Sequence, residues 1–248
     1  MKRIYLGLKF ALSYFTVLPI RFGRDDDLSH PNVLAAMLYT LPLVGVILAG
    51  LTIGLFCSLE SLHWLGAIVA AAAYMALYGF IHTEAVIDVA DAVYAAHSGK
   101  DPYQVIKEPT VGAMGVLYGV SFLFLKIAAL SFLLMHHLFF PFIAIAMTSR
   151  IALLILIKHH DFRSSFVSQL HNSLHVRSLM VLIGLFGAIG FYILSWPFLS
   201  LFFIGIGTAI LLCAFAKKSL GFINGDVLGM ALEGVELILI LAVLLAWS

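Results

Sequence analysis

Two groups of carboxylates are the residues of this chain best suited to chemistry. The chain has only thirteen acidic residues. Six of them lie in two short stretches beside long apolar segments: Glu84, Asp88, Asp91, Asp226, Glu233 and Glu236. Carboxylates in or next to apolar helices are costly, so they are usually paired or functional. These two stretches are therefore the candidate site.

The first stretch reads IHTEAVIDVADAVYAAHSGK. On a helix, Glu84, Asp88 and Asp91 fall within an arc of about 60°. Like charges on one face repel unless a cation lies among them, and Mg²⁺ binds carboxylates together with phosphates and water. We therefore predict that these acids ligate a metal ion, with a solvated acidic helix face as the alternative. His82 precedes them and suits a base, a ligand or a hydrogen-bonded orienting group.

The second stretch begins with Asn224-Gly225-Asp226, which reads as a turn that feeds a helix. Asp226 is predicted either as a metal ligand or as the residue that caps this helix. Glu233 follows about two turns later on nearly the same face, and Glu236 lies roughly 80° from Asp226. An acid at the depth of Glu233 needs a partner, for which Arg150, Lys126 or a metal qualify.

Three basic residues are candidates for compensating the charge of a phosphate: Lys107, Arg150 and Lys217. Arg150 interrupts the apolar segment 139–158, so phosphate binding and internal pairing with Glu233 are both open. Lys217 and Lys218 end an apolar segment and equally suit anchoring at the membrane surface.

The composition says what must position these residues. Of 248 residues, 62% are hydrophobic and 11% charged, which excludes a water-soluble globule. The net charge of +1 gives no reason to expect a nucleic-acid partner. About 20 apolar residues cross a bilayer as a helix, and seven segments qualify, at about 33–57, 62–81, 114–136, 139–158, 179–197, 199–216 and 228–247. We therefore predict an all-α polytopic membrane bundle that forms one domain over residues 1–248.

The stretch 4–20 is shorter and contains Lys9, so spanning, re-entrant and interfacial placements are all open. Lys2 and Arg3 favour a cytoplasmic N-terminus, which favours a re-entrant or interfacial helix. The polar connections lie at 21–32, 82–113, 159–178 and 217–227. With Lys158, they hold nine of the fourteen Lys and Arg residues. The positive-inside rule places these connections, and with them the catalytic motifs at about 82–113 and 217–236, on the cytoplasmic side. The C-terminus is then expected on the far side.

Small residues and cysteines add two structural expectations. The pairs Gly50/Gly54 and Gly115/Gly119 have the spacing that lets membrane helices pack closely. Cys57 and Cys213 lie in apolar runs without metal-ligand spacing, so we expect inert core thiols.

Three motifs resemble, in order, those of the adenosylcobinamide-GDP ribazoletransferases, also called cobalamin 5'-phosphate synthases. The family pattern H-L-D-G-L-A-D-T-A-D-G aligns with residues 82–92 without a gap. The pattern K/R-D-S-R-I/L-G aligns with 107–112, and G-G-x-T-G-D-x-L-G-A-x-x-E-L-x-E with 221–236. The F-T-V-L-P-I run at 15–20 and the Ser149-Arg150 pair are also similar to family features.

Several departures from these patterns concern charged or glycine positions. Glu84 and Glu108 stand in place of aspartates, and Ala85 and Ala92 in place of glycines. Thr110 stands where the family has arginine, which removes one phosphate contact.

The resemblance implies an enzyme that completes the nucleotide loop of cobalamin. A ribose hydroxyl of α-ribazole, or of its 5'-phosphate, attacks the cobinamide-side phosphorus of adenosylcobinamide-GDP, and GMP leaves. Mg²⁺ would be held by Glu84, Asp88, Asp91 and Asp226, and Asp91 or His82 would take the proton. Substrate contacts would come from Lys107, Arg150, Lys217, Asn224 and Gly225.

The resemblance further implies a multi-pass protein of the cell (inner) membrane, in contact with the lipid bilayer. The sequence leaves the oligomeric state open, a homo-oligomer included. Two other functions are weighed beside this one. A CDP-alcohol phosphotransferase acting on a lipid would carry a D-G-x-x-A-R run, which is absent here. An ion-coupled transporter would use intramembrane acids such as Glu233, but the chain lacks the internal repeats typical of transporters.

Overall fold

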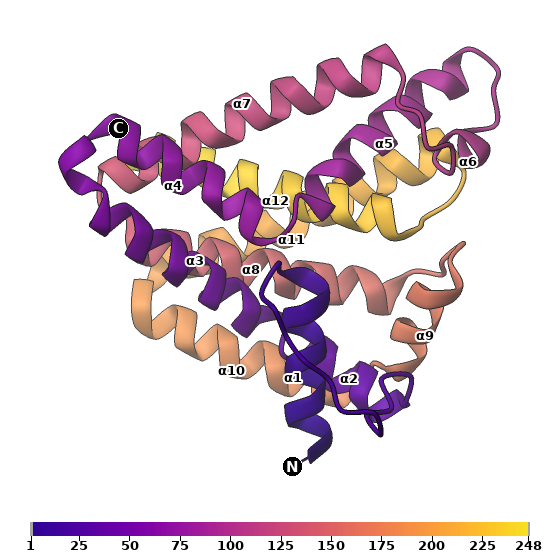
Figure 1. Ribbon diagram of the computed structural model, residues 1–248, viewed down its shortest axis with the longest axis horizontal. Helices are drawn as coiled ribbons and strands as arrows, with labels where there is room; N and C mark the ends of the chain where they lie inside the picture. The colour runs from indigo at the N-terminus through magenta and orange to yellow at the C-terminus, as the bar shows by residue number, and fades with distance from the viewer. Residues whose placement is uncertain (1, 248) are drawn as a thin grey trace.

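The computed structural model describes residues 2–247 and contains, within them, helices and no strands (Figure 1). The helices are α1 (Lys2–Phe15), α2 (Pro31–Tyr39), α3 (Leu41–Ser58), η1 (Glu60–Leu62), α4 (Trp64–Leu77), α5 (Ile81–His97), α6 (Pro102–Val105), α7 (Ala113–Met135), α8 (Phe139–His159), α9 (Ser165–Ser173), α10 (Val176–Leu194), α11 (Trp196–Leu220) and α12 (Gly225–Trp247). Six of these are long and apolar enough to cross a membrane, namely α3, α7, α8, α10, α11 and α12. The prediction of an all-α polytopic membrane protein is confirmed.

Helices α8 and α12 form the centre of the bundle. In α8, 78% of the most apolar window is buried inside the protein, against 17% in α10 at the periphery. Helices α3, α11 and α12 pack around α8, while α5, α7 and α11 pack against α12. The exposed apolar side chains of α10 and α11 then face the lipid, as the bilayer requires of a polytopic bundle.

The segment predicted as one helix over 33–57 is two helices. The chain breaks at Thr40, whose hydroxyl donates hydrogen bonds to the carbonyls of Ala36 and Met37, at 3.0 and 2.9 Å. Pro42 lies in the first turn of α3, where its missing N–H costs nothing, but it could not continue the hydrogen-bonding of α2. Only the α3 part, Leu41–Ser58, is counted among the spans.

The segment predicted as a span over 62–81 also ends early. Helix α4 stops at Leu77, and the chain turns by 80° into α5. Gly79 and Phe80 both have positive φ, +66° and +55°, which no helix tolerates. Taken together, α4 and α5 pass as a seventh, broken span or a re-entrant segment. The bend sends the first acidic stretch along α5 in a new direction.

The N-terminal stretch forms α1, a helix of 14 residues that lies against α2 and is not among the spanning helices. At 1.5 Å per residue it is too short to cross a bilayer. The expectation of a short N-terminal helix is confirmed, and its interfacial or re-entrant placement stays a prediction.

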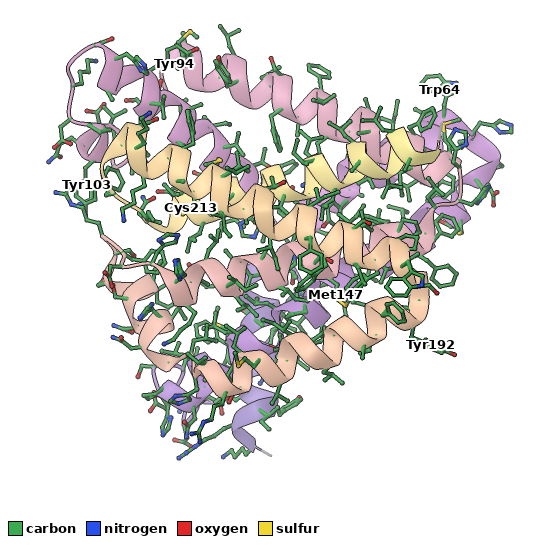
Figure 2. All side chains as sticks on the ribbon, turned by 180° about the vertical axis from the view of Figure 1, so that it is seen from behind. Trp64, Tyr94, Tyr103, Met147, Tyr192 and Cys213 are labelled. Carbon is green, nitrogen blue, oxygen red and sulfur yellow. The ribbon has the colours of Figure 1, made fainter. Side chains whose placement is uncertain are left out.

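The polar connections gather at one end of the molecule. In Figure 1, α6, α9 and the loop into α12 lie at the right, whereas the α3–α4 connection and the C-terminus lie at the left. Tyr103 marks the polar end in Figure 2, and Trp64 and Tyr192 mark the other. Trp64, Tyr192 and Trp196 are all exposed there, a placement typical of the interfacial aromatic belt of membrane proteins.

Candidate active site

Helix α5 is held between α7 and α12 by contacts at glycines. A Cβ atom built on Gly229 of α12 would lie 2.8 Å from the Cβ of Ala85, and one on Gly115 of α7 would lie 2.9 Å from the Ile87 carbonyl oxygen. Both positions are therefore closed to any larger residue. The prediction of close packing at Gly115/Gly119 is confirmed, but the one at Gly50/Gly54 is wrong, because neither glycine has a neighbour within 4 Å.

This packing brings the two acidic stretches together. The negative charges of Asp226, Glu84 and Asp91 all act on the Asp88 carboxylate, and Glu84 acts on Asp226 as well. Glu84 is exposed, while Asp88, Asp91 and Asp226 are half-buried. The site therefore concentrates negative charge at the polar end of the α5–α12 contact.

The four predicted metal ligands do not form a ready-made cage. Within residues 2–247, no three His, Cys, Asp or Glu side chains are grouped closely enough to hold a metal ion by themselves. Mg²⁺ commonly binds one or two carboxylates and completes its shell with phosphates and water, so the donor chemistry of Asp88 and Asp226 fits it. The metal role of these residues stays a prediction.

Asp91 has a structural partner. Its Oδ2 accepts a hydrogen bond of 2.9 Å from the backbone N–H of Gly112, the residue that precedes α7. The carboxylate thereby satisfies one of the free N–H groups at this helix start. Part of its hydrogen-bonding capacity is used by the fold, which weakens the prediction that Asp91 takes the substrate proton.

The start of α12 is fixed by Asn224 rather than by Asp226. The Asn224 side-chain oxygen accepts from the N–H of Val227 at 3.1 Å, as expected of a helix cap, and its amide donates to Asp226 Oδ2 at 2.6 Å. The capping alternative for Asp226 is therefore wrong. Asn224, predicted as a substrate contact, is buried and orients the carboxylate of Asp226, and it also lines the polar cavity at this end.

A polar cavity of about 400 Å³ opens at this end, lined by Tyr103, Ile106, Lys107, Arg163, Ser164, Ser165, Asn224, Gly225 and Asp226. The Tyr103 ring lies between two cations: Lys107 Nζ is 4.0 Å from its centroid and Arg163 Cζ is 3.6 Å away. A hydrogen bond with Lys107, and the positive charges of Lys107 and Arg163, lower the pKa of the Tyr103 phenol below its usual value of 10.0. The cavity thus offers two positive charges, and neither of them is in an ion pair within the described chain.

The loops that carry these cations are tied to the acidic stretch. The Arg163 N–H donates to the carbonyl of Ile223 at 2.8 Å. Phe222 meets the Tyr103 ring edge-on, with 5.2 Å between the ring centroids. These contacts keep α6, the loop before α9 and the start of α12 together around the cavity.

A second, mainly apolar cavity of about 150 Å³ lies behind the first. Its lining includes Tyr14, Phe15, His82, Phe166, Gly225 and Asp226. The last two residues also line the polar cavity. Asp226 therefore stands where a basic compartment and an apolar, aromatic compartment meet.

A buried ion network crosses the bundle, and none of its charged residues lines either of these two cavities. Lys126 donates to Glu233 Oε2 at 2.5 Å and to Glu236 Oε2 at 2.7 Å. Arg150 pairs with Glu236, which also accepts from Tyr74 at 2.9 Å and from Ser149 at 3.2 Å. Two positive and two negative charges thereby balance, and α4, α7, α8 and α12 are linked.

Comparison with known proteins settles the family. The family model for cobalamin-5-phosphate synthase matches residues 7–244. The chain belongs to the cobalamin-5-phosphate synthase family. Proteins named adenosylcobinamide-GDP ribazoletransferase are similar to it throughout. The one from Brevibacillus brevis is 27% identical over 96% of this chain and 97% of its own length, and the one from Desulforamulus reducens is 25% identical over 98% and 97%. No solved structure matches the chain.

The alternatives of a lipid phosphotransferase and of a transporter gain no support from these relatives. The resemblance inferred from the motifs is confirmed. Since the match to this synthase family covers almost the whole chain, the motif regions that the fold brings together form the candidate active site.

Two predicted substrate contacts of this synthase family member lie elsewhere. Arg150 is buried and pairs internally, as one of the two alternatives held, but its partner is Glu236 rather than Glu233, because Lys126 pairs with Glu233. Lys217 is exposed on the last turn of α11 and lines neither cavity, a position that suits the anchoring alternative.

Lys107 and Gly225, in contrast, line the polar cavity as their predicted roles require. Sequence reasoning missed Tyr103 and Arg163. Both lie in polar connections whose charge was noticed but whose folding could not be read from spacing. One cysteine expectation also changes: Cys213 is buried, but Cys57 is exposed.

Proposed function

We propose that this protein is an adenosylcobinamide-GDP ribazoletransferase whose active centre lies at Asp226, between the polar and the apolar cavity. The observation that carries the proposal is the meeting of both acidic stretches beside a basic cavity. The names of relatives that cover nearly the whole chain support the same activity.

The reaction transfers a phosphorus-linked group. A ribose hydroxyl oxygen of α-ribazole, or of its 5'-phosphate, bonds to the cobinamide-side phosphorus of adenosylcobinamide-GDP. The bond from that phosphorus to the bridging oxygen breaks, GMP leaves with the electron pair, and the hydroxyl proton passes to a base. The product carries the completed nucleotide loop.

The residues of the polar cavity compensate the charge of the diphosphate. Lys107 and Arg163 bring positive charge from two different loops, and preorganised charge of this kind stabilises phosphoryl transfer. Ser164 caps α9 through its hydroxyl, which accepts from the Val167 N–H, so the loop with Arg163 is held in place. The diphosphate then lies beside Asp226.

We assign the proton acceptor to His82 rather than to Asp91. His82 lines the apolar cavity with Asp226, and its ring packs against the rings of Phe15 and Tyr78. Asp91 lines neither cavity and already binds Gly112. An unprotonated imidazole nitrogen can accept a proton from a hydroxyl group.

Mg²⁺ held by Asp88 and Asp226, together with the substrate diphosphate, would supply further positive charge at the leaving GMP. We further propose that the site faces the cytoplasm and that the protein resides in the cell (inner) membrane. The basic connections gather at the polar end, in keeping with the positive-inside rule. Nucleotide substrates are available on that side.

The test is GMP release by the purified protein in lipid nanodiscs, given adenosylcobinamide-GDP and α-ribazole with and without Mg²⁺. We expect release only when both substrates and Mg²⁺ are present. Asp226→Asn should lower kcat by at least about 100-fold. Asp25→Asn changes an exposed aspartate near the N-terminus, distant in sequence from Asp226, and should leave kcat unchanged.

His82→Asn should lower kcat by roughly 100- to 10,000-fold, as loss of a general base does, and Asp91→Asn should cost less. Release without α-ribazole, or full activity of folded Asp226→Asn, contradicts the proposed function.

A further inference from the structure

The apolar cavity is distinctive in its lining. Four of the residues that line it carry rings, namely Tyr14 and Phe15 of α1, His82 of α5 and Phe166 of α9. Tyr14 and Phe166 lie 5.4 Å apart between centroids, and Phe15 stacks on His82 at 5.9 Å with 28° between the planes. Aliphatic side chains of α8, α9 and α12 close the rest. A flat aromatic ligand is the kind that such walls recognise.

The size of the cavity sets a second limit. At about 150 Å³ it is of the same order as apolar cavities that bind one small aromatic molecule. A corrin ring or a guanosine with its ribose and phosphates is far too large for it. A small planar ring system is the kind of ligand that this volume admits.

The polar groups at the rim suit a ring nitrogen. Tyr14 lines the cavity together with Asp226 and carries a phenolic hydroxyl. A protonated phenol donates a hydrogen bond to an unprotonated ring nitrogen. The His82 ring offers a second polar atom in the same wall.

We propose that this cavity binds the planar base of the acceptor nucleoside and so selects the base that enters the product. The inference rests on the proposed function, which supplies a nucleoside with a benzimidazole-type base. Because Gly225 and Asp226 line both cavities, a base held here places its ribose at Asp226, facing the diphosphate in the polar cavity. Two substrates then approach Asp226 from opposite sides.

The test measures base binding separately from turnover. Free benzimidazole and α-ribazole are titrated onto the protein in nanodiscs, followed by saturation-transfer NMR. Val167→Phe puts a ring into the cavity from α9, and Val181→Phe adds the same ring on the lipid-exposed face of α10 as the matched control. Phe166→Leu removes one aromatic wall while keeping apolar bulk.

We expect both ligands to bind the wild type, and Val167→Phe to weaken their binding by roughly 5- to 150-fold, the range observed for losing a base-stacking site. Phe166→Leu should weaken it less, and Val181→Phe not at all. The KM for adenosylcobinamide-GDP should change little in any variant. Ribose 5-phosphate, which has no base, should not compete.

Two results overturn the inference: no saturable benzimidazole binding to the wild type, or equal binding by wild type, Val167→Phe and Phe166→Leu. Failure of the proposed function is seen differently, as absence of GMP release by the wild type with both substrates present. Benzimidazole binding that Val167→Phe abolishes would then still assign the cavity to an aromatic base.

Discussion

Lys126 offers the sharpest test of the buried ion network. It is fully buried, and it is the only cation that contacts Glu233 in the described chain, while it shares Glu236 with Arg150. Lys126→Met keeps the apolar stem but removes the charge. The network then holds one positive and two negative charges, and Glu233 loses its counter-ion.

The expected cost follows from that imbalance. Removing one partner of a buried pair typically destabilises a protein by about 3–5 kcal/mol, because an unpaired charge remains in a medium of low polarity. For a chain of this size, each kcal/mol lowers the unfolding midpoint by about 2–4 °C. Lys126→Met should therefore lower the midpoint by roughly 6–20 °C.

A second substitution should restore much of the loss. In Lys126→Met/Glu233→Gln, the remaining Arg150–Glu236 pair is neutral, so the double variant should be more stable than Lys126→Met alone. Thermal unfolding of the protein in nanodiscs measures all three, with exposed Lys100→Met as the matched control. A wild-type midpoint for Lys126→Met, or a double variant less stable than the single one, would refute the reasoning.

Two further predictions concern the site. Gly229→Val should abolish GMP release and lower the unfolding midpoint, because the added side chain would clash with Ala85 and push α5 away from α12. Gly50→Val is the control and should do neither, because the space around Gly50 is open. Unchanged activity of Gly229→Val would show that the distance between α5 and α12 does not matter. Arg163→Gln should raise the KM for adenosylcobinamide-GDP roughly tenfold, the low end for a hydrogen bond to a charged group because the guanidinium is exposed. The increase in KM should be smaller at high salt, because salt screens the charge of Arg163. Arg24 is exposed and lines neither cavity, so Arg24→Gln should leave the KM unchanged. An equal increase in KM in both variants would contradict a local role of Arg163.

The sequence predicted the membrane class, the family and two groups of acids that the fold brings together. Long apolar runs give an unambiguous signal, since only helices and closed barrels satisfy their backbone in lipid. The helical spacing of Glu84, Asp88 and Asp91 showed their shared face, and the α5–α12 contact then brought them to Asp226. These features depend on local periodicity, which the chain displays directly.

Features that depend on how helices meet were beyond reach. Spacing along α12 showed that Glu233 and Glu236 point in different directions, but only the arrangement of α7 and α8 decides that Lys126 takes both and Arg150 takes Glu236. The 80° bend after α4 rests on two positive φ values at Gly79 and Phe80. Of these only the glycine hints at a turn in advance, because phenylalanine rarely adopts that conformation.

Pro42 was a sign in the sequence that the helix is interrupted near Thr40, but the continuous apolar composition of 33–57 favoured a single helix. Tyr103 and Arg163 are separated by sixty positions and by two spanning helices, α7 and α8. Nothing in the spacing of two polar loops shows that a tyrosine in one will stack on an arginine in the other. Contacts of this kind require the folded chain.

The close packing of α5 against glycines of α7 and α12 also affects how the protein adapts to membranes of different thickness. The spacing between the acidic stretches is set by the close contact of α5 with Gly229 of α12, while α10 and α11 are the least buried of the spanning helices. A thinner or thicker bilayer is accommodated by tilting of the outermost helices. We therefore expect the activity to depend little on the lipid composition of the membrane, because the outermost helices adjust to the bilayer thickness.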